Sequence, residues 1–323
     1  NSAARIGIAD IDTQQTVWAQ LPGVAKDMYV PRMDWANNSD DVLIQQLNRK
    51  QDTNRVFLAD AESGAVRELF VEREETFLDD IEDPKWLKKA DAFIWMSERS
   101  GWRHVYRVSR DASTFTNLTP GDFDVVKLLE IDEANGWIYF IASPDNVTQR
   151  YLYRSRLDGS GQMERVTPPD YAGTNSYQMA HDSAWAIHTH SSIMQPPVYQ
   201  LVSLPDHKVH HVLEDNAELA DRLAQLELGD VEFYTVPVRD GLVLDGFILR
   251  PPNFDASKGY PIINFVYGEP AGQTAKDAWA GSTGMWHLLM SQRGFIISSV
   301  DNRGTRAPRG RDWRRSLYGR VGI

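Results

Sequence analysis

The sequence predicts a mainly β fold: a partial β-propeller of about four and a half four-stranded blades, followed by a smaller region that mixes strands and helices. A strand–turn–strand pattern recurs along the chain, and its aligned residues, which lie 46–49 positions apart, are Ile8, Phe57, Tyr106, Tyr153 and Tyr199. Short strand-like runs with a period in the forties are typical of propeller blades. Helical solenoids have similar periods, but they show a 3.6-residue apolar repeat that this sequence lacks.

A further strand precedes each hairpin after the first. These strands are centred near Leu43, Phe93, Ile138 and Ala186. The first repeat holds a single hairpin within residues 1–20, so the chain begins inside a blade. Because a propeller protects its strand edges by closing its ring, we expect more blades upstream. We expect packing between blades from six tryptophans: Trp35, Trp86, Trp95, Trp102, Trp137 and Trp185.

The propeller pattern ends at Leu213, which predicts a propeller domain over residues 1–213. Residues 214–228 predict a linking amphipathic helix, because Leu219, Leu223 and Leu226 share one helical face. Asp215 or Asn216 is a candidate N-cap.

The remaining residues, 229–323, predict a second domain. Two strands over 231–238 and 242–249 are separated by Asp-Gly, which indicates a hairpin. Apolar runs over 261–267 and 294–300 are typical of buried sheet strands. Between them we predict a helix within 277–293. Gly281-Ser-Thr-Gly284 does not have the spacing of a nucleophile motif and is interpreted as a loop or helix start.

Composition excludes several classes of function. Hydrophobic residues are 42% and charged residues 24%, as in ordinary globular proteins, and the net charge of −11 argues against nucleic-acid binding. No apolar run approaches the ~20 residues needed to span a bilayer. There is no cysteine, so disulfides, cysteine-ligated zinc and a thiol nucleophile are excluded. The seven arginines after Val300 are expected to form structural ion pairs or face solvent, not nucleic acid.

Neither a metal nor a cofactor is predicted. His188 and His190 lie on the same face of a strand, but a metal site needs at least one more ligand, so packing is the interpretation. His210 and His211 point to opposite faces, which argues against joint ligation. No glycine-rich phosphate-binding motif follows a strand.

Several motifs resemble the dipeptidyl peptidase IV family of serine peptidases, in the prolyl oligopeptidase clan. They are Ser97–Tyr106, Val212–Leu219, Leu249–Asp255, Tyr260–Gln273 and Val300–Gly304. The resemblance runs over nearly the whole chain and identifies 229–323 as the N-terminal portion of an α/β-hydrolase domain, truncated before the nucleophile. One residue departs from the family pattern: Glu269 stands where a small residue is usual.

The resemblance implies hydrolysis of oligopeptides, with release of N-terminal dipeptides after proline or alanine. A Ser–Asp–His triad carries out the reaction in this family, without a cofactor, and a tyrosine donates a hydrogen bond to the oxyanion. By motif that tyrosine is Tyr267, and a phenol with an ordinary pKa near 10 keeps its proton at pH 7. The resemblance also implies peptide substrates as partners, is compatible with a homodimer, and suggests a periplasmic or secreted location.

The chain contains no Gly-x-Ser-x-Gly nucleophile elbow. We therefore expect it to be a fragment that is inactive alone. The glutamate pair with which the family holds the substrate amino terminus is expected upstream of this chain, and Glu74 and Glu75 are interpreted as a solvated acidic loop. Two alternatives stay open: another clan member, such as an oligopeptidase or acylaminoacyl peptidase, or a non-catalytic propeller binding module.

Overall fold

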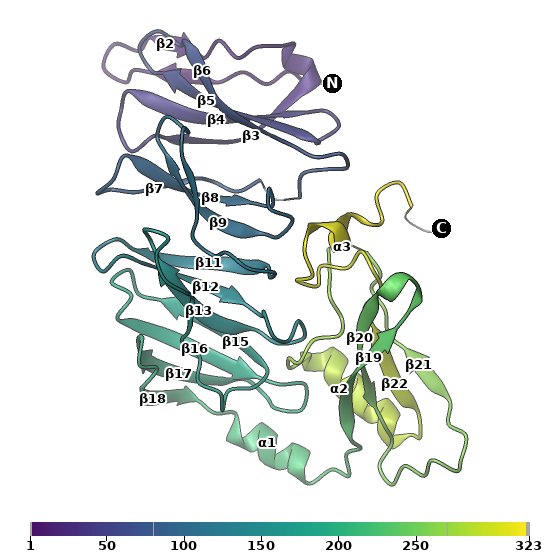
Figure 1. Ribbon diagram of the computed structural model, residues 1–323. Coiled ribbons are helices and arrows are strands. Elements are labelled where there is room, and N and C mark those ends of the chain that lie inside the picture. Colours follow the sequence, from purple (N-terminus) through teal and green to yellow (C-terminus); the bar gives the residue numbers. More distant parts are fainter. Residues whose placement is uncertain (1, 80, 270, 321–323) are drawn as a thin grey trace. The chain divides into compact units, whose positions relative to one another are not determined.

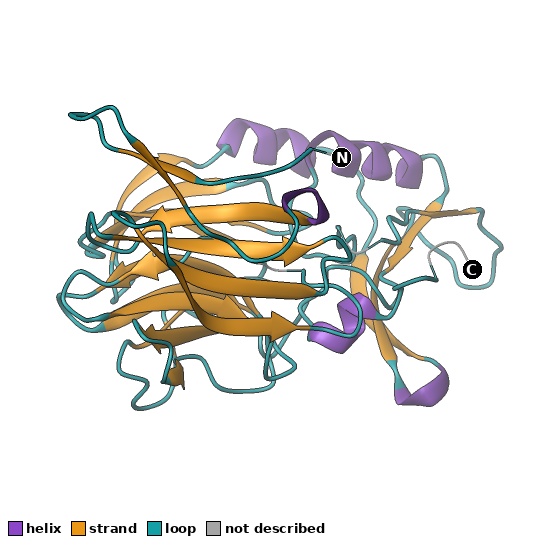
Figure 2. Cartoon of the chain, turned by 90° about the horizontal axis from the view of Figure 1, so that it is seen from above, coloured by secondary structure: helices purple, strands orange, loops and turns teal. Residues whose placement is uncertain are grey.

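The computed structural model describes residues 2–79, 81–269 and 271–320, with Asp240 described by its backbone alone. The chain forms two compact units: residues 1–120 with 157–160, and residues 121–156 with 161–323. Strands dominate both units, and helices are few (Figures 1 and 2).

The first unit begins with a two-stranded sheet, β1 (Gly7–Ala9) with β2 (Thr16–Trp18), followed by the 3₁₀ turn η1 (Ala25–Asp27). Two four-stranded antiparallel sheets follow, each built from strands consecutive in the chain. The first sheet comprises β3 (Met28–Trp35), β4 (Asp41–Asn48), β5 (Thr53–Asp60) and β6 (Val66–Arg73). The second comprises β7 (Lys85–Trp86), β8 (Ala92–Ser97), β9 (His104–Ser109) and β10 (Phe115–Asn117).

Aromatic side chains form the core between these two sheets. Phe93 and Trp95 of β8 are buried in one cluster with Leu43 of β4. Trp95 meets Phe70 of β6 edge to face, with ring centroids 5.2 Å apart. Each such buried side chain contributes roughly 1.5–3 kcal/mol through loss of apolar surface to water. Trp95 thus packs between blades as predicted, whereas Trp35, on the edge strand β3, stays half exposed.

The second unit contains two further blades of the same construction. One comprises β11 (Val125–Asp132), β12 (Trp137–Ala142), β13 (Tyr151–Arg156) and β14 (Glu164–Arg165). The other comprises β15 (Thr174–Met179), β16 (Trp185–Ser191), β17 (Val198–Ser203) and β18 (Val209–Glu214). One buried cluster joins them, with Trp137 and Leu152 from the first blade and Val202 from the second. Among the described residues, the predicted partial propeller is therefore confirmed as four four-stranded sheets and one two-stranded sheet.

The linking helix is shorter than predicted. Helix α1 spans Ala217–Ala224, because β18 continues to Glu214 and takes the start of the predicted segment. The N-cap residue is Asn216, whose side chain makes no capping hydrogen bond, while the Asp215 carboxylate, one residue earlier, accepts a hydrogen bond from the Ala217 amide at 2.9 Å. Leu223 is buried, but Leu226 lies beyond the helix and is exposed. The predicted domain boundaries at 213 and 228 stay a prediction.

The last sheet of the second unit has the order β19-β20-β22-β21. Strands β19 (Val231–Pro237) and β20 (Val243–Leu249) form the predicted hairpin around the 3₁₀ turn η2 (Arg239–Gly241). Strand β22 (Ile296–Val300) pairs antiparallel with β20 and parallel with β21 (Ile262–Asn264). Helix α2 (Gly281–Gln292) contacts β20 and β22, and α3 (Arg311–Arg315) follows near the C-terminus.

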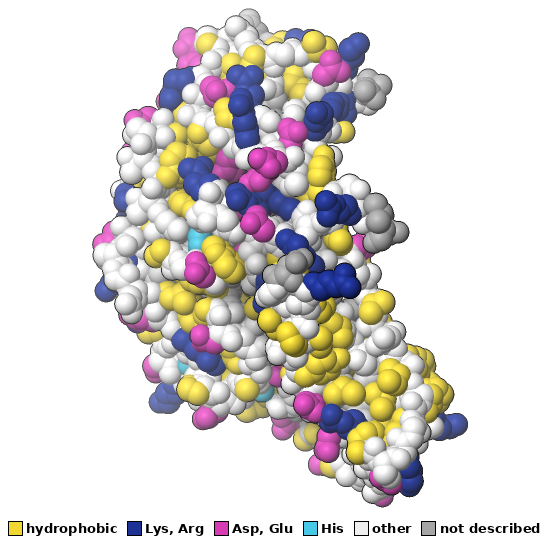
Figure 3. Space-filling model, turned by 45° about the vertical axis from the view of Figure 1, so that its right-hand side comes forward, with side chains coloured by type: hydrophobic (Ala, Val, Ile, Leu, Met, Phe, Trp, Pro, Cys, Tyr) yellow, Lys and Arg dark blue, Asp and Glu magenta, His cyan; other side chains and the backbone are white. Residues whose placement is uncertain are grey.

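Strand β21 is not the buried strand that the sequence predicts. Ile262 is 62% exposed and Val266 is 62% exposed. Within the described residues, β21 lies at one edge of the sheet and pairs with β22. Figure 3 shows hydrophobic side chains gathered on this part of the second unit. By contrast, Ile297 of the central strand β22 is fully buried, as predicted.

The fourth blade holds a buried cluster of aromatic and histidine rings. His188 stacks on Tyr177 with centroids 4.6 Å apart and meets His207 edge to face at 4.7 Å. The Asn175 amide donates to the Arg150 carbonyl, so its oxygen faces His188, 2.8 Å from Nε2. His188 therefore carries a proton on Nε2. His188 and His190 share a face of β16 and are both buried.

This cluster predicts acid sensitivity. Burial, with the neighbouring charges of His207 and His190, lowers the pKa of His188 from 6.5 to about 3. Between pH 6.5 and about 3 the unfolded chain therefore binds a proton that folded His188 does not bind. Stability is complete above pH 6.5, where His188 is neutral in both states, and it decreases as the pH falls toward 3. The free energy of unfolding should fall by up to about 1.4 kcal/mol per pH unit. Urea unfolding across this range should show a shallower slope for His188→Gln, whereas the exposed control His210→Gln should keep the full slope.

Candidate active site

The carboxyl ends of two parallel strands place polar groups at one edge of the last sheet. Tyr267 lies three residues after β21, and Asp301 directly follows β22. Since β21 and β22 run parallel, both residues emerge at the same edge. In open α/β sheets, ligands bind outside the carboxyl ends of the strands.

Tyr267 presents its ring and hydroxyl to solvent. Its side chain is 52% exposed, and its pKa is raised above the usual 10 by the hydrogen bond and the negative charge of Glu269. The phenol is therefore a protonated donor at neutral pH. Glu269, the residue that departs from the family pattern, is thus the charged neighbour that acts on the ionisation of Tyr267.

Gly268 and Gly272 shape the backbone around Tyr267. Gly268 has φ +84°, a conformation that side chains with a Cβ disfavour. Gly272 lies against the tyrosine ring so closely that a Cβ there would stand 2.7 Å from Cδ1 of Tyr267. The absence of a side chain at Gly272 therefore makes room for the ring.

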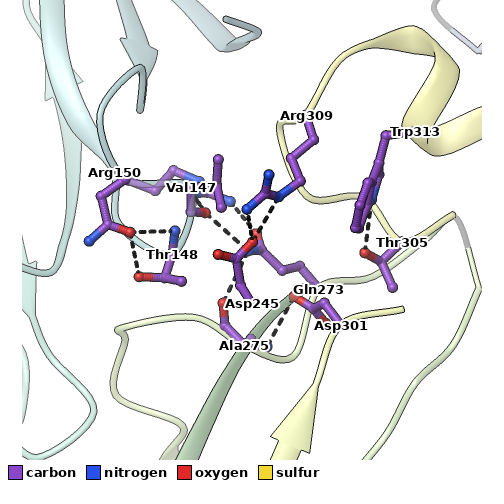
Figure 4. A network of polar contacts seen from close by, with 11 residues as sticks. Val147, Thr148, Arg150, Asp245, Gln273, Ala275, Asp301, Thr305, Arg309 and Trp313 are labelled. Atoms are coloured by element: carbon purple, nitrogen blue, oxygen red, sulfur yellow. Dashed lines mark hydrogen bonds and ion pairs between the residues drawn. The ribbon is translucent and has the colours of Figure 1, made fainter. Parts of the chain in front are cut away.

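Asp301 is a buried carboxylate that accepts hydrogen bonds from the loop after Tyr267. Its Oδ1 accepts from the amide and the hydroxyl of Thr274, at 2.8 and 2.9 Å, and its Oδ2 accepts from the Ala275 amide at 3.2 Å. Burial raises the pKa of Asp301, and these donors act in the opposite direction. Figure 4 shows Asp301 beside Ala275 and Gln273.

The same loop contacts the blade formed by β11–β14. The Arg150 guanidinium donates to the Gln273 side-chain oxygen, and the Gln273 amide nitrogen donates to the carbonyl of Val147 at 3.0 Å. Burial lowers the pKa of Arg150 to about 10. Asp277 adds a second link, since its carboxylate accepts from Gln149 at 2.9 Å. The blade and the sheet therefore hold residues 273–277 from two sides (Figure 4).

Two arginines of the C-terminal segment form ion pairs within the second unit. Arg309 binds Asp245 of β20 through Nε at 2.8 Å and Nη2 at 2.5 Å, and Figure 4 shows its guanidinium directed at that carboxylate. Arg314 binds Asp124, and both side chains are almost fully buried. The prediction of structural ion pairs is confirmed for these two arginines.

A cavity of about 60 Å³ lies near the sheet, and its lining is mostly apolar, with side chains of Phe247, Leu249 and Leu288. Lys276 and His287 also line the cavity. Burial lowers the pKa of both side chains. The cavity is separate from the exposed hydroxyl of Tyr267, which does not line it.

Within residues 2–79, 81–269 and 271–320, no three His, Asp or Glu side chains are grouped as a metal site would require. In that same part of the chain, none of the helices combines the length and the apolar character needed to cross a membrane.

Comparison with known proteins identifies the family. The model of the dipeptidyl peptidase IV (DPP IV) N-terminal region matches residues 1–197. The chain belongs to the dipeptidyl peptidase IV family. It is similar in structure to dipeptidyl peptidase 4 of Porphyromonas gingivalis, with a TM-score of 0.90 and 26% identity over 100% of this chain and 45% of that chain.

Two fungal relatives agree with this assignment. A "probable dipeptidyl-aminopeptidase B" of Coccidioides posadasii is 29% identical over 86% of this chain and 31% of its own length. "Dipeptidyl peptidase 4" of Arthroderma otae is 26% identical over 92% of this chain and 39% of its own length. The chain thus spans between about a third and less than half of the proteins that it matches.

The family motifs locate part of this site. The Tyr260–Gln273 and Val300–Gly304 motifs contain Tyr267, Gln273 and Asp301, but the sequence singles out Tyr267 alone. Arg150 carries no sequence signal, since it lies in the propeller repeat, 123 residues from its partner Gln273. Of the two glutamates interpreted as a solvated acidic loop, Glu75 is exposed and Glu74 is half-buried.

Proposed function

We propose that this chain is part of a serine dipeptidyl peptidase that releases N-terminal dipeptides from oligopeptides, with a preference for proline or alanine as the second residue. Membership of the dipeptidyl peptidase IV family supports the reaction. Relatives named as dipeptidyl-aminopeptidase B and dipeptidyl peptidase 4 support the length of the released peptide.

We propose that Tyr267 donates a hydrogen bond to the oxyanion that forms on the scissile carbonyl. The observation that carries this role is an exposed, protonated phenol at the carboxyl end of β21. A donor aimed at developing charge lowers the barrier because the hydrogen bond strengthens in the transition state. The negative charge of Glu269 keeps the hydroxyl protonated, so the hydroxyl can donate to the carbonyl oxygen when substrate binds.

The chain itself has no Gly-x-Ser-x-Gly motif. We therefore propose that the Ser–Asp–His triad lies outside these residues and that the isolated 323-residue chain is inactive. Peptides are the proposed substrates of the complete protein.

The test uses the protein expressed from its complete reading frame. We expect it to hydrolyse a chromogenic Gly-Pro substrate with a free amino group and to react with a fluorophosphonate probe for serine nucleophiles. The matched substrate with an acetylated amino terminus should be turned over at least ~10²-fold more slowly, since its ammonium group is missing. Preference for the acetylated substrate would instead indicate an acylaminoacyl peptidase or oligopeptidase, and turnover of neither would indicate a binding module.

A further inference from the structure

The segment that follows β22 holds the loop after Tyr267 at several points. The Asp301 carboxylate accepts from Thr274 and Ala275. The Arg306 amide donates to the Gly272 carbonyl at 2.9 Å, and the Asn302 side chain donates to the Gly268 carbonyl at 3.3 Å. Residues 301–306 therefore form a bracket along Gly268 and residues 272–275.

Asp301 is the best-anchored member of this bracket. Its side chain is almost fully buried, and its own amide donates to the Asp245 carbonyl at 2.9 Å. The preceding residue, Val300, pairs with Gly246 in the centre of the sheet. The Ser299 hydroxyl also donates to the Thr274 hydroxyl, at 2.8 Å. A shift of the Asp301 carboxylate would thus require a shift of the sheet itself.

The bracket reaches the tyrosine through Gly272. The ring of Tyr267 rests on the backbone of Gly272, where a Cβ would stand 2.7 Å from the ring. Gly272 in turn lies two residues before Thr274, the double donor to Asp301. Displacement of residues 272–275 would therefore remove the surface against which the ring lies.

We propose that Asp301 is a positioning residue for Tyr267: its buried carboxylate fixes residues 272–275, and these fix the tyrosine ring and the direction of its hydroxyl. The proposal rests on the proposed function, in which Tyr267 is the oxyanion donor. Asp301 does not touch the substrate in this scheme. It acts by holding the donor in place before the substrate arrives, which is the preorganisation that such a donor requires.

The experiment measures Tyr267 itself in the 323-residue chain. With 3-fluorotyrosine at position 267, ¹⁹F NMR reports the titration of that hydroxyl. Glu269 raises the pKa of Tyr267, so E269Q should lower the titration midpoint. The size of this downward shift reports how closely the loop holds the hydroxyl to Glu269.

Asp301→Asn should reduce the E269Q shift and broaden the resonance. The asparagine side chain has one acceptor oxygen where the carboxylate has two, so part of the hydrogen bonding to residues 274 and 275 is lost and the loop is released. The matched control is Asp132→Asn, which changes another buried carboxylate that accepts from a local turn, through the Asn135 amide at 3.0 Å. The control should keep the full E269Q shift. An undiminished shift in Asp301→Asn, or an equal reduction in the control, would overturn the proposal.

A milder variant covers the case in which Asp301→Asn does not fold. Thr274→Val removes one donor to Asp301 and keeps the carboxylate and the side-chain size. It should reduce the E269Q shift by less than Asp301→Asn does, and a shift equal to that of the unmodified chain would overturn the proposal.

Activity is measured separately in the complete protein. Asp301→Asn should lower kcat by about 10²-fold with a smaller change in KM, because misplacing a catalytic group by about 1 Å has an effect of that size. Asp132→Asn should leave kcat unchanged. A reduced E269Q shift together with unchanged kcat would support the positioning of Tyr267 by Asp301 and overturn the proposed role of Tyr267 in the reaction.

Discussion

Replacing Arg314 by methionine should lower the free energy of unfolding by about 3–5 kcal/mol. Arg314 and Asp124 form an ion pair in which the side chains are 5% and 3% exposed. Methionine keeps most of the apolar stem but removes the guanidinium. The buried Asp124 carboxylate would then lose its ion pair with Arg314 and keep the Gly310 amide as a donor at 2.8 Å, and removing one partner of a buried ion pair is strongly destabilising.

The measurement is urea denaturation followed by tryptophan fluorescence, to which the buried Trp313 of α3 contributes. The matched control is Arg222→Met, because Arg222 pairs with Glu218 at 2.6 Å but both side chains are more than 70% exposed. That exposed pair should contribute under about 0.5 kcal/mol. Equal shifts of the midpoint for the two variants would contradict the assignment of Arg314. The double variant Asp124→Leu/Arg314→Met should recover much of the loss, since it removes both charges of the pair.

The propeller could be predicted from the sequence because its signal is local and repeated. Ile138 and Phe93 lie in short apolar strands, and the same strand pattern returns with each blade. Each repeat supports the assignment of the others, so errors at single strands do not change the architecture.

The edge strand β21 shows where local reasoning fails. An apolar run such as Ile262–Asn264 has the composition of a buried strand, but burial depends on which strands lie beside it. In the part of the chain that the structure describes, β21 pairs with β22, and Ile262 is exposed. Strand order is a property of the tertiary fold and is not written in the run itself.

The candidate site divides in the same way. Tyr267 could be found because a short motif surrounds it. The contacts that hold its loop could not, since Arg150 meets Gln273 across 123 residues and Arg314 meets Asp124 across 190. Pairings over such distances depend on the packing of blade and sheet, which no single segment encodes.

Tyr267→Phe in the complete protein should lower kcat by about 10²–10³-fold and change KM much less. Loss of the phenol oxygen should not change the stability of the fold, because Tyr267 is 52% exposed. Its contact with Gly272 is made by the ring, which phenylalanine keeps. The lost hydrogen bond is strongest when negative charge has developed on the carbonyl oxygen. The effect should therefore appear in the chemical step and not in substrate binding.

The matched control is Tyr318→Phe, because Tyr318 is also 52% exposed and lies in the C-terminal segment of the same unit. Both variants should unfold at the same urea concentration as the parent protein, and Tyr318→Phe should keep its kcat.

The pH dependence separates the donor from a general base. A donor acts in its protonated form, so E269Q, which lowers the pKa of Tyr267, should bring the alkaline loss of activity to lower pH. Unchanged turnover in Tyr267→Phe, in a protein that remains folded, would exclude Tyr267 as the oxyanion donor and would direct the search for that donor to other groups at the carboxyl end of the sheet.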